Sequence, residues 1–479
     1  MISFLISIVA LVLGYMIYGR VIERIFGPDD RKTPALAHPD GVDYIAMPTW
    51  KVFMIQFLNI AGTGPIFGAI MGAWFGPASY LWIVFGCIFA GSVHDYLSGM
   101  MSLRHDGAGL PELIGKYLGN VMRIIMLVFS MLLLLMVGAV FVTSPAGLLS
   151  NIGGEKMMWV VIIIIYYITA TLLPIDKIIG KIYPLFAIAL IFMALGLFVA
   201  LIIKMPTIPE VWNIGSGMDS WINAQTHNGI DLLGAKDYLN HYTLFPAMFI
   251  TIACGAISGF HATQSPLMAR CLKSEKLGRP VFYGSMITEG IVALVWAAVS
   301  SWFFYSRGWR EVMPQEEINK FIAQVGNADG KTLIQFFDNP AAVVKYVCSS
   351  WLGVVGGILA MLGVVAAPIT SGDTALRSAR LIIADFFKFD QKPIAKRLMI
   401  AIPMFAAVIL LLSWQSNNPD GFKVLWGYFG WSNQTLSVFT LWAITMYLFK
   451  QKKCFWVTLI PAIFMTVVSL SFILFPLFK

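Results

Sequence analysis

Runs of about 20 mostly apolar residues recur along the chain, and they constrain its fold more than any other feature. A run of about this length crosses a bilayer as one helix. The composition agrees, because 58% of the residues are hydrophobic and only 12% are charged, whereas about a quarter of a soluble domain is charged. An all-α polytopic membrane protein of about twelve transmembrane helices is therefore predicted. The expected spans cover residues 2–19, 52–73, 80–103, 121–147, 157–175, 182–203, 244–265, 281–304, 346–371, 398–413, 424–449 and 455–477.

The distribution of basic residues predicts how these spans are oriented. Cytoplasmic loops of membrane proteins collect Lys and Arg. If both termini lie outside, 23 of the 33 Lys and Arg residues fall on the cytoplasmic side. The net charge of +8 then follows from topology and does not require a nucleic-acid partner. The five cysteines indicate neither a disulfide framework nor a CxxC metal site.

Two interrupted spans suggest an inverted repeat. The stretch NIAGTGPIFG, residues 59–68, places three glycines and a proline inside an apolar run, and ACGAISGFHATQSP, residues 253–266, does the same in a later one. Each is the first of five consecutive spans, and because five is odd, the two blocks cross the membrane in opposite senses. The predicted division is an extra span in 1–20, repeats at 51–204 and 244–449, and a last span in 454–479.

Such paired interruptions are typical of a transporter binding site near the bilayer midplane. Glycine lets the backbone unwind and proline removes a donor, so freed amides and carbonyls face a cavity instead of lipid. Close helix packing by small residues is the alternative for either stretch alone, but two matched interruptions favour binding. The expected central site consists of Asn59, Ala61, Gly62, Thr63, Gly64, Gly255, Ser258, Gly259 and His261.

Charged residues inside spans cost at least about 2.5–3.5 kcal/mol on insertion scales, so each needs a reason. His94 and Asp95 are adjacent within the third span and are candidates for proton relay, although a buried polar pair that pins neighbouring helices is an equal alternative. Glu289, inside the eighth span, is a candidate proton carrier or a structural hydrogen-bonding residue. His261 is expected to meet an anionic substrate, to accept a proton or to satisfy the unwound backbone.

Cation ligands are suggested by PITSGDTALRSAR, residues 368–380. The hydroxyls of Thr370 and Ser371 and the carboxylate of Asp373 are hard oxygen ligands suited to a small cation. Two alternative roles for Asp373 are an ion pair with Arg377 at helical spacing and a cap of the helix. A transition-metal site built from His94, Asp95 and His261 is a weak alternative, because these residues lack a ligand motif.

Four stretches, in this order, resemble the carbon starvation protein A (CstA) family: DGVDYIAMPTWKVFMIQFLNIAGTGPIFG, AGSVHDYLSGMMSLRHDG, LFPAMFITIACGAISGFHATQSP and WGYFGWSNQTLS. They run from residue 40 to about 438. The resemblance implies a transporter of the bacterial inner membrane that takes up peptides, or in some members pyruvate, in the starvation response. The stretch after FHATQSP departs from the longer serine-, threonine- and glycine-rich stretch of enterobacterial members. Because this break is expected to line the binding site, the resemblance does not fix which substrate the chain carries.

The family is in turn similar to transporters of the LeuT fold, whose 5 + 5 inverted repeat has a broken first helix in each half. This likeness implies a sodium site formed by the backbone carbonyls of Leu58 and Ala61 with Thr370 and Ser371, and the nearby Asp373 suits either sodium or a proton. The last core helix carries Asn433 and Gln434, for which a packing role is expected.

The predicted function is therefore secondary active import of small peptides, or of a small carboxylate such as pyruvate, by alternating access coupled to a Na⁺ or H⁺ gradient. A channel or a nutrient sensor is the competing class. An enzyme is not expected, because the HExxH and GxSxG motifs are absent from the sequence. No cofactor is expected beyond a coupling Na⁺, and the expected partners are the substrate and membrane lipid.

Overall fold

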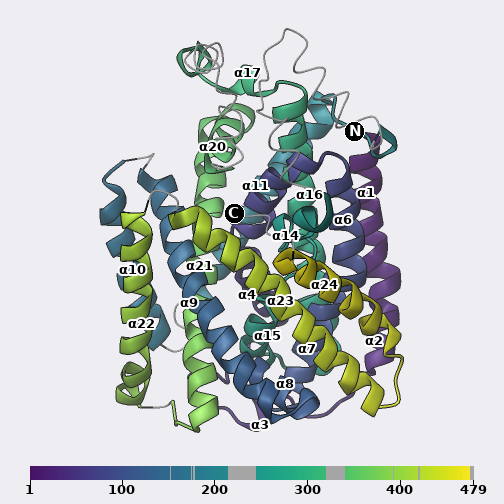
Figure 1. The fold of residues 1–479 in the computed structure, drawn as a ribbon, viewed down its shortest axis with the longest axis vertical. Helices are drawn as coiled ribbons and strands as arrows, with labels where there is room; N and C mark the ends of the chain where they lie inside the picture. Colours follow the sequence, from purple (N-terminus) through teal and green to yellow (C-terminus); the bar gives the residue numbers. More distant parts are fainter. Residues whose placement is uncertain are drawn as a thin grey trace.

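The computed structural model describes residues 1–150, 153–173, 175, 179–213, 244–319, 340–391, 393–418 and 421–474. Within these ranges every regular element is a helix. Figure 1 shows that most of the long helices run along the longest axis of the molecule, with α10 and α22 at one lateral edge and α1 at the other. This is the arrangement expected of a membrane bundle, because a helix satisfies all its backbone hydrogen bonds within its own segment.

The first half of the chain opens with one span over Ile2–Phe26 and continues through a broken helix to three further long spans. In the labels, α marks an α-helix and η a short π- or 3-10-helical segment. Its elements are α1 (Ile2–Leu13), η1 (Gly14–Tyr18), α2 (Gly19–Phe26), α3 (Pro34–Ala37), α4 (Thr49–Ile60), η2 (Gly64–Gly68), α5 (Ala69–Gly72), η3 (Ala73–Phe75), α6 (Ala78–Gly86), η4 (Cys87–Gly91), α7 (Ser92–Leu103), α8 (Leu110–Leu118), α9 (Asn120–Ser150), α10 (Lys156–Leu172), α11 (Ile179–Lys204) and η5 (Val211–Asn213).

The second half begins with another broken helix. Its elements are η6 (Leu244–Met248), α14 (Phe249–Thr251), α15 (His261–Ala269), η7 (Glu275–Leu277), η8 (Arg279–Tyr283), α16 (Gly284–Tyr305), α17 (Trp309–Val312), α20 (Pro340–Trp351), α21 (Gly353–Phe387), α22 (Ile394–Asn417), α23 (Gly421–Lys450) and α24 (Trp456–Leu474).

The all-helical fold class is confirmed, whereas the count of twelve spans stays a prediction. Among the described residues, eight helices are long and apolar enough to cross a membrane, or nine if the bent pair Thr49–Ile60 and Gly64–Phe75 is one span. Three expected spans fall outside this group. Lys156–Leu172 has only 17 residues, the segment from residue 244 is interrupted, and Gly421–Lys450 carries the polar run Ser432 to Gln434 in its middle.

The outer helices expose large apolar side chains, whereas the inner ones are buried. Ile6 on α1 is 61% exposed, Leu410 on α22 is 71% exposed and Ile460 on α24 is 65% exposed. In contrast, the apolar windows of the spans Ala78–Leu103 and Glu275–Tyr305 are 83% and 89% buried. Apolar surface over several helices is costly in water and favourable in lipid. The chain is therefore an integral membrane protein.

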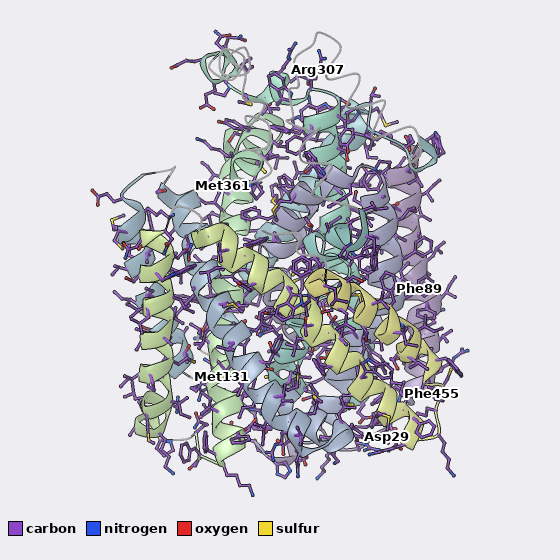
Figure 2. The ribbon with its side chains drawn as sticks, viewed as in Figure 1. Asp29, Phe89, Met131, Arg307, Met361 and Phe455 are labelled. Carbon is purple, nitrogen blue, oxygen red and sulfur yellow. The ribbon has the colours of Figure 1, made fainter. Side chains whose placement is uncertain are left out.

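One end of the bundle is closed by ion pairs between segments that are far apart in sequence. Asp43, in the segment before α4, accepts from Arg377 Nη1 at 3.0 Å, and its other oxygen lies 3.5 Å from Arg380 Nη2. At the same end Arg104 donates to Glu275 at 2.9 Å. Figure 2 places Asp29 at this end and Arg307 at the opposite end, the separation that the predicted topology requires. Which end faces the cytoplasm stays a prediction.

The environment of Asp43 fixes its charge. Burial alone would raise the pKa of this carboxyl, but the guanidiniums of Arg380, Arg377 and Arg270 outweigh burial and hold the pKa below its usual range. A carboxyl with a lowered folded-state pKa stabilises the fold fully above its unfolded pKa, about 3.9, and loses this contribution as the pH falls through the folded value. At neutral pH the contribution of Asp43 is complete.

We predict that Asp43→Asn lowers the free energy of unfolding by about 3–5 kcal/mol at neutral pH, because it leaves the buried guanidiniums of Arg377 and Arg380 without a counter-charge. The measurement is denaturant-induced unfolding in detergent micelles. Asp30→Asn is the matched control, because Asp30 forms an exposed pair with Lys276 at 2.7 Å, and such pairs contribute little. Equal stability of the two variants would contradict a structural role for the Asp43 pairs.

Candidate functional site

The first interrupted span is broken where the sequence predicts it. Helix α4 ends at Ile60, and Ala61 leaves the helical conformation at φ −79° and ψ 49°. The helix resumes at Gly64 as a π-helical turn, and the two parts differ in direction by 52°. Asn59 and Thr63 flank this break and are fully buried, and their side-chain polar atoms have no hydrogen-bond partner within the described part of the chain. The break therefore presents unused donors and acceptors to the interior.

The second interrupted span has a longer non-helical segment. Helix α14 ends at Thr251 and α15 begins at His261, so residues 252–260 run through turns inside the bundle. This segment contains the predicted Gly255, Ser258 and Gly259. Unwound backbone at this depth must find partners within the protein, because lipid offers none.

The two breaks lie directly against each other. A Cβ built on Gly64 would lie 2.4 Å from both Cβ and Sγ of Cys254, and one built on Gly255 would lie 4.0 Å from Cα of Pro65. Gly68 continues this approach, because its Cβ would lie 2.8 Å from the carbonyl oxygen of Thr251. The predicted pairing of the two breaks is thus realised as contact, and Gly64 is a glycine because of this close approach.

Asn433 on α23 fixes the second break. Its side-chain oxygen accepts from the backbone N–H of Phe260 at 2.7 Å and from the hydroxyl of Ser258 at 3.0 Å. Its backbone oxygen accepts from the N–H of Gly259 at 3.2 Å. A Cβ on Gly259 would lie 2.4 Å from that same oxygen. Ser258 and Gly259 therefore help to hold the break, and the packing role expected of Asn433 takes this specific form.

The charged residues singled out within the spans come together at this break. Asp95 on α7 bridges two imidazoles, with 2.8 Å between Oδ1 and His94 Nδ1 and 2.8 Å between Oδ2 and His261 Nδ1. On the other side of the ring, His261 Nε2 lies 3.5 Å from Glu289 Oε2 on α16. All four side chains are fully buried. The residues form one chain of titratable groups, although their assignment to proton transfer stays a prediction.

Cys254 joins this group, and the sequence reasoning did not include it. Its Sγ, an imidazole nitrogen of His261 and a carboxylate oxygen of Glu289 all lie within 4.8 Å of one another. The signal available in the sequence was weak, because Cys254 and His261 share the same interrupted stretch but Glu289 comes from another span.

The residues predicted to hold a cation are brought together in part. Ser371 Oγ on α21 donates to the backbone oxygen of Leu58 at 3.1 Å, and a Cβ on Gly62 would lie 3.1 Å from that Oγ. Ala61 is the first residue after α4, at the same break. Thr370 Oγ1, in contrast, donates to the carbonyls of its own helix. A direct role for the Thr370 hydroxyl therefore stays a prediction.

Asp373 lies two residues after Ser371 on α21, and it is held by a residue that the sequence reasoning missed. Tyr183 on α11 donates its hydroxyl to Asp373 Oδ2 at 2.5 Å, and the same hydroxyl lies 3.1 Å from the backbone oxygen of Thr370. Asp373 Oδ1 is buried without a hydrogen-bond partner among the described residues. The ion pair of Arg377 is with Asp43, so helical spacing did not identify the partner of this arginine.

Comparison with known proteins agrees with this geometry. The chain matches the family described as "Carbon starvation protein CstA" over residues 1–152 and 143–472. It belongs to this family. An uncharacterized membrane protein of Haemophilus influenzae is 45% identical over 346 residues, which cover 64% of this chain and 91% of that protein. The peptide transporter CstA of Campylobacter jejuni is 26% identical over 562 residues, covering 96% and 77%. That of Escherichia coli is 24% identical over 580 residues, covering 97% and 79%.

Solved structures show the same fold at low sequence identity. A manganese transporter of Eremococcus coleocola matches with a TM-score of 0.56 and 14% identity, covering 91% of this chain and 90% of that one. A substrate-bound, outward-open Na⁺-coupled sialic acid symporter matches with a TM-score of 0.52 and 12% identity, covering 99% and 98%. The LeuT-like fold class is therefore confirmed for this CstA family member, whereas the exact limits of its two repeats stay a prediction.

We predict that Gly64→Ala destabilises the protein by about 1–3 kcal/mol, the usual cost of overpacking a close contact. The added methyl group would fall on Cβ of Cys254, which cannot move without shifting the second break. Gly427→Ala on α23 is the control, because no atom lies within 4 Å of the position that its methyl group would take. Thermal unfolding in detergent should separate the two variants, and an unchanged midpoint for Gly64→Ala would argue against direct contact of the breaks.

Proposed function

We propose that this chain is a secondary active transporter of the bacterial inner membrane that imports small peptides by alternating access, driven by a Na⁺ or H⁺ gradient. The observation that carries the proposal is the contact between two broken helices whose buried polar groups lack partners within the described residues. Relatives in the family are named peptide transporters, which supports a peptide as the substrate. Pyruvate or another small carboxylate is the second substrate class to test.

The polar groups at the first break suit a peptide. Gln56 and Asn59 lie one turn apart on α4, and both amide groups are buried with no partner in the described part of the chain. Thr63 adds a buried hydroxyl on the far side of the break. A peptide has several N–H donors and carbonyl acceptors that can satisfy these groups, and its carboxylate is attracted to the N-terminal ends of the helices that resume after the breaks.

The residues around Ser371 fit a coupling cation. The oxygen atoms of Ser371 and Leu58 are already 3.1 Å apart, and Asp373 Oδ1 is an orphaned buried acceptor close by in sequence. Oxygen ligands with one carboxylate suit Na⁺, and the carboxylate alone suits H⁺. A bound cation would supply the charge that opposes Asp373 and would draw Leu58, at the edge of the first break, toward α21.

A channel or a nutrient sensor remains the competing class of function. A channel carries its substrate only down its own gradient, whereas a symporter accumulates substrate when an ion gradient is imposed. Uptake under controlled gradients therefore separates the two classes.

We predict that proteoliposomes containing the protein accumulate labelled di- and tripeptides when a Na⁺ or an H⁺ gradient is imposed, each gradient being tested separately. Ser371→Ala and Asp373→Asn should each reduce gradient-driven uptake about tenfold or more, since loss of one charge-assisted contact of about 1.4 kcal/mol changes binding by that factor. Labelled pyruvate is assayed in parallel to decide the substrate class.

The matched control is Ser300→Ala. Ser300 is also a fully buried serine, and its hydroxyl donates to the backbone oxygen of Trp296 within α16 at 2.6 Å. This variant should transport at the wild-type rate. Uptake driven by H⁺ that depends on Asp373 but not on Ser371 would assign coupling to the proton. Downhill flux that ignores both gradients would refute the symporter and favour a channel.

A further inference from the structure

We infer that Cys254, His261 and Glu289 form a binding site for one divalent transition-metal ion of the Zn²⁺ type. The three side chains come from the second break, from the first residue of α15 and from α16, and they offer a thiol sulfur, an imidazole nitrogen and a carboxylate oxygen within 4.8 Å of one another. This inference does not rest on the identity of the substrate or of the coupling ion proposed above.

The spacing of the donor atoms suits a small metal ion. His261 Nε2 and Glu289 Oε2 lie 3.5 Å apart. Ligands about 2.0–2.1 Å from a tetrahedral Zn²⁺ stand about 3.4 Å apart, so this pair is already at coordination distance. The sulfur of Cys254 lies within 4.8 Å of the other two donor atoms. A Zn–S bond of about 2.3 Å places sulfur about 3.6 Å from the other ligands, so a small shift of the Cys254 side chain is required to complete the set.

Two of the three ligands carry atoms that lack hydrogen-bond partners, whereas the sulfur of Cys254 has only long contacts of 3.7 Å with Ser258 and Asn433. His261 Nε2 and both oxygens of Glu289 are fully buried and make no hydrogen bond within the described residues. Unpartnered polar and charged groups in an apolar interior are costly. One divalent ion would bind His261 Nε2 and the Glu289 carboxylate, and this carboxylate together with a Cys254 thiolate would neutralise its charge.

His261 is held in the orientation that a metal ligand needs. Its Nδ1 lies 2.8 Å from Asp95 Oδ2, so the Nδ1–H donates to the carboxylate and Nε2 presents its lone pair to the site. His94 occupies the other oxygen of Asp95 at 2.8 Å. A carboxylate that orients a ligating histidine in this way is typical of metal sites. Asp95 is therefore a positioning residue here.

The donor set selects the kind of ion. A thiolate with an imidazole suits Zn²⁺ and related transition metals, whereas Na⁺, Mg²⁺ and Ca²⁺ prefer oxygen ligands. Three protein ligands leave a fourth position for water. A bound ion would tie residues of the second break to α16, so it would hold this break in place and oppose its movement during transport. It would also occupy the Nε2 and carboxylate atoms considered for proton transfer.

The test uses the full-length protein in detergent micelles after removal of metal by a chelator. Equilibrium dialysis against Zn²⁺ and elemental analysis give the stoichiometry and affinity, and Co²⁺ replaces Zn²⁺ to detect a thiolate-to-metal charge-transfer band. Wild type should bind one ion per chain and show the band. Cys254→Ser should lose the band. Asp95→Asn, which removes only an outer hydrogen-bond partner, should weaken binding roughly 10- to 100-fold. Cys254→Ser and Glu289→Gln each remove a ligand and should weaken binding by more than that.

Cys348→Ser is the matched control, because Cys348 is also buried but lies on α20, outside the cluster. It should bind like wild type. A Zn²⁺-dependent rise in the thermal unfolding midpoint of wild type, absent in Cys254→Ser, gives a second readout. A cooperative thermal transition of Cys254→Ser without metal shows that the variant is folded. The site would be overturned if wild type did not bind Zn²⁺, or if Cys254→Ser and Glu289→Gln both bound it with the affinity of wild type. Neither result depends on peptide uptake, so failure here leaves the transport proposal standing.

Discussion

The fold depends on how the backbone groups freed by the two breaks are satisfied inside the bundle. Lipid has no donors or acceptors for them, so the protein must supply every partner. For the second break, Asn433 supplies three contacts at once, through its side-chain oxygen to Ser258 and Phe260 and through its backbone oxygen to Gly259. A helix for which only packing was expected thus sets the path of the segment from Ile252 to Phe260. The positions of Cys254 and His261 follow from that path.

Close approach of the backbone then brings the charged groups together. A Cβ on Gly91, just before α7, would lie 2.2 Å from the carbonyl oxygen of Ala256 in the second break. Contact at this distance seats α7 against the break, and Asp95 meets His261 one turn further on. The cost of burying these charges is met by hydrogen bonds among them, and the atoms that remain unpartnered within the described residues mark where a ligand or an ion is still required.

Sequence reasoning succeeded where the signal was local. The glycines and proline of residues 59–68 predicted a break that the structure places at Ala61, and the insertion cost of a charged side chain identified His94, Asp95 and Glu289 as residues that need partners. It failed where the partner was remote. Arg377 was considered for Asp373 because four positions separate them on one helix, but it pairs with Asp43, which lies 334 residues away in the sequence. Tyr183 and Cys254 were missed for the same reason, since no spacing rule links them to Asp373 or Glu289.

The first break links the two groups that a coupled transporter needs. Leu58 and Gly62 lie against Ser371 on one side, and Gly64 and Pro65 lie against the second break on the other. The unwound residues 61–63 lie between Leu58 and Gly64 and include Gly62 itself, so both sets of contacts involve the same short segment. Two ligands that order the same short segment affect each other's binding free energy equally. A cation at Ser371 would fix one end of the segment and a substrate between the breaks would fix the other, so each would reduce the ordering cost of binding the other. Coupling between ion and substrate then needs no long pathway through the bundle, because the shared unwound segment is itself the connection.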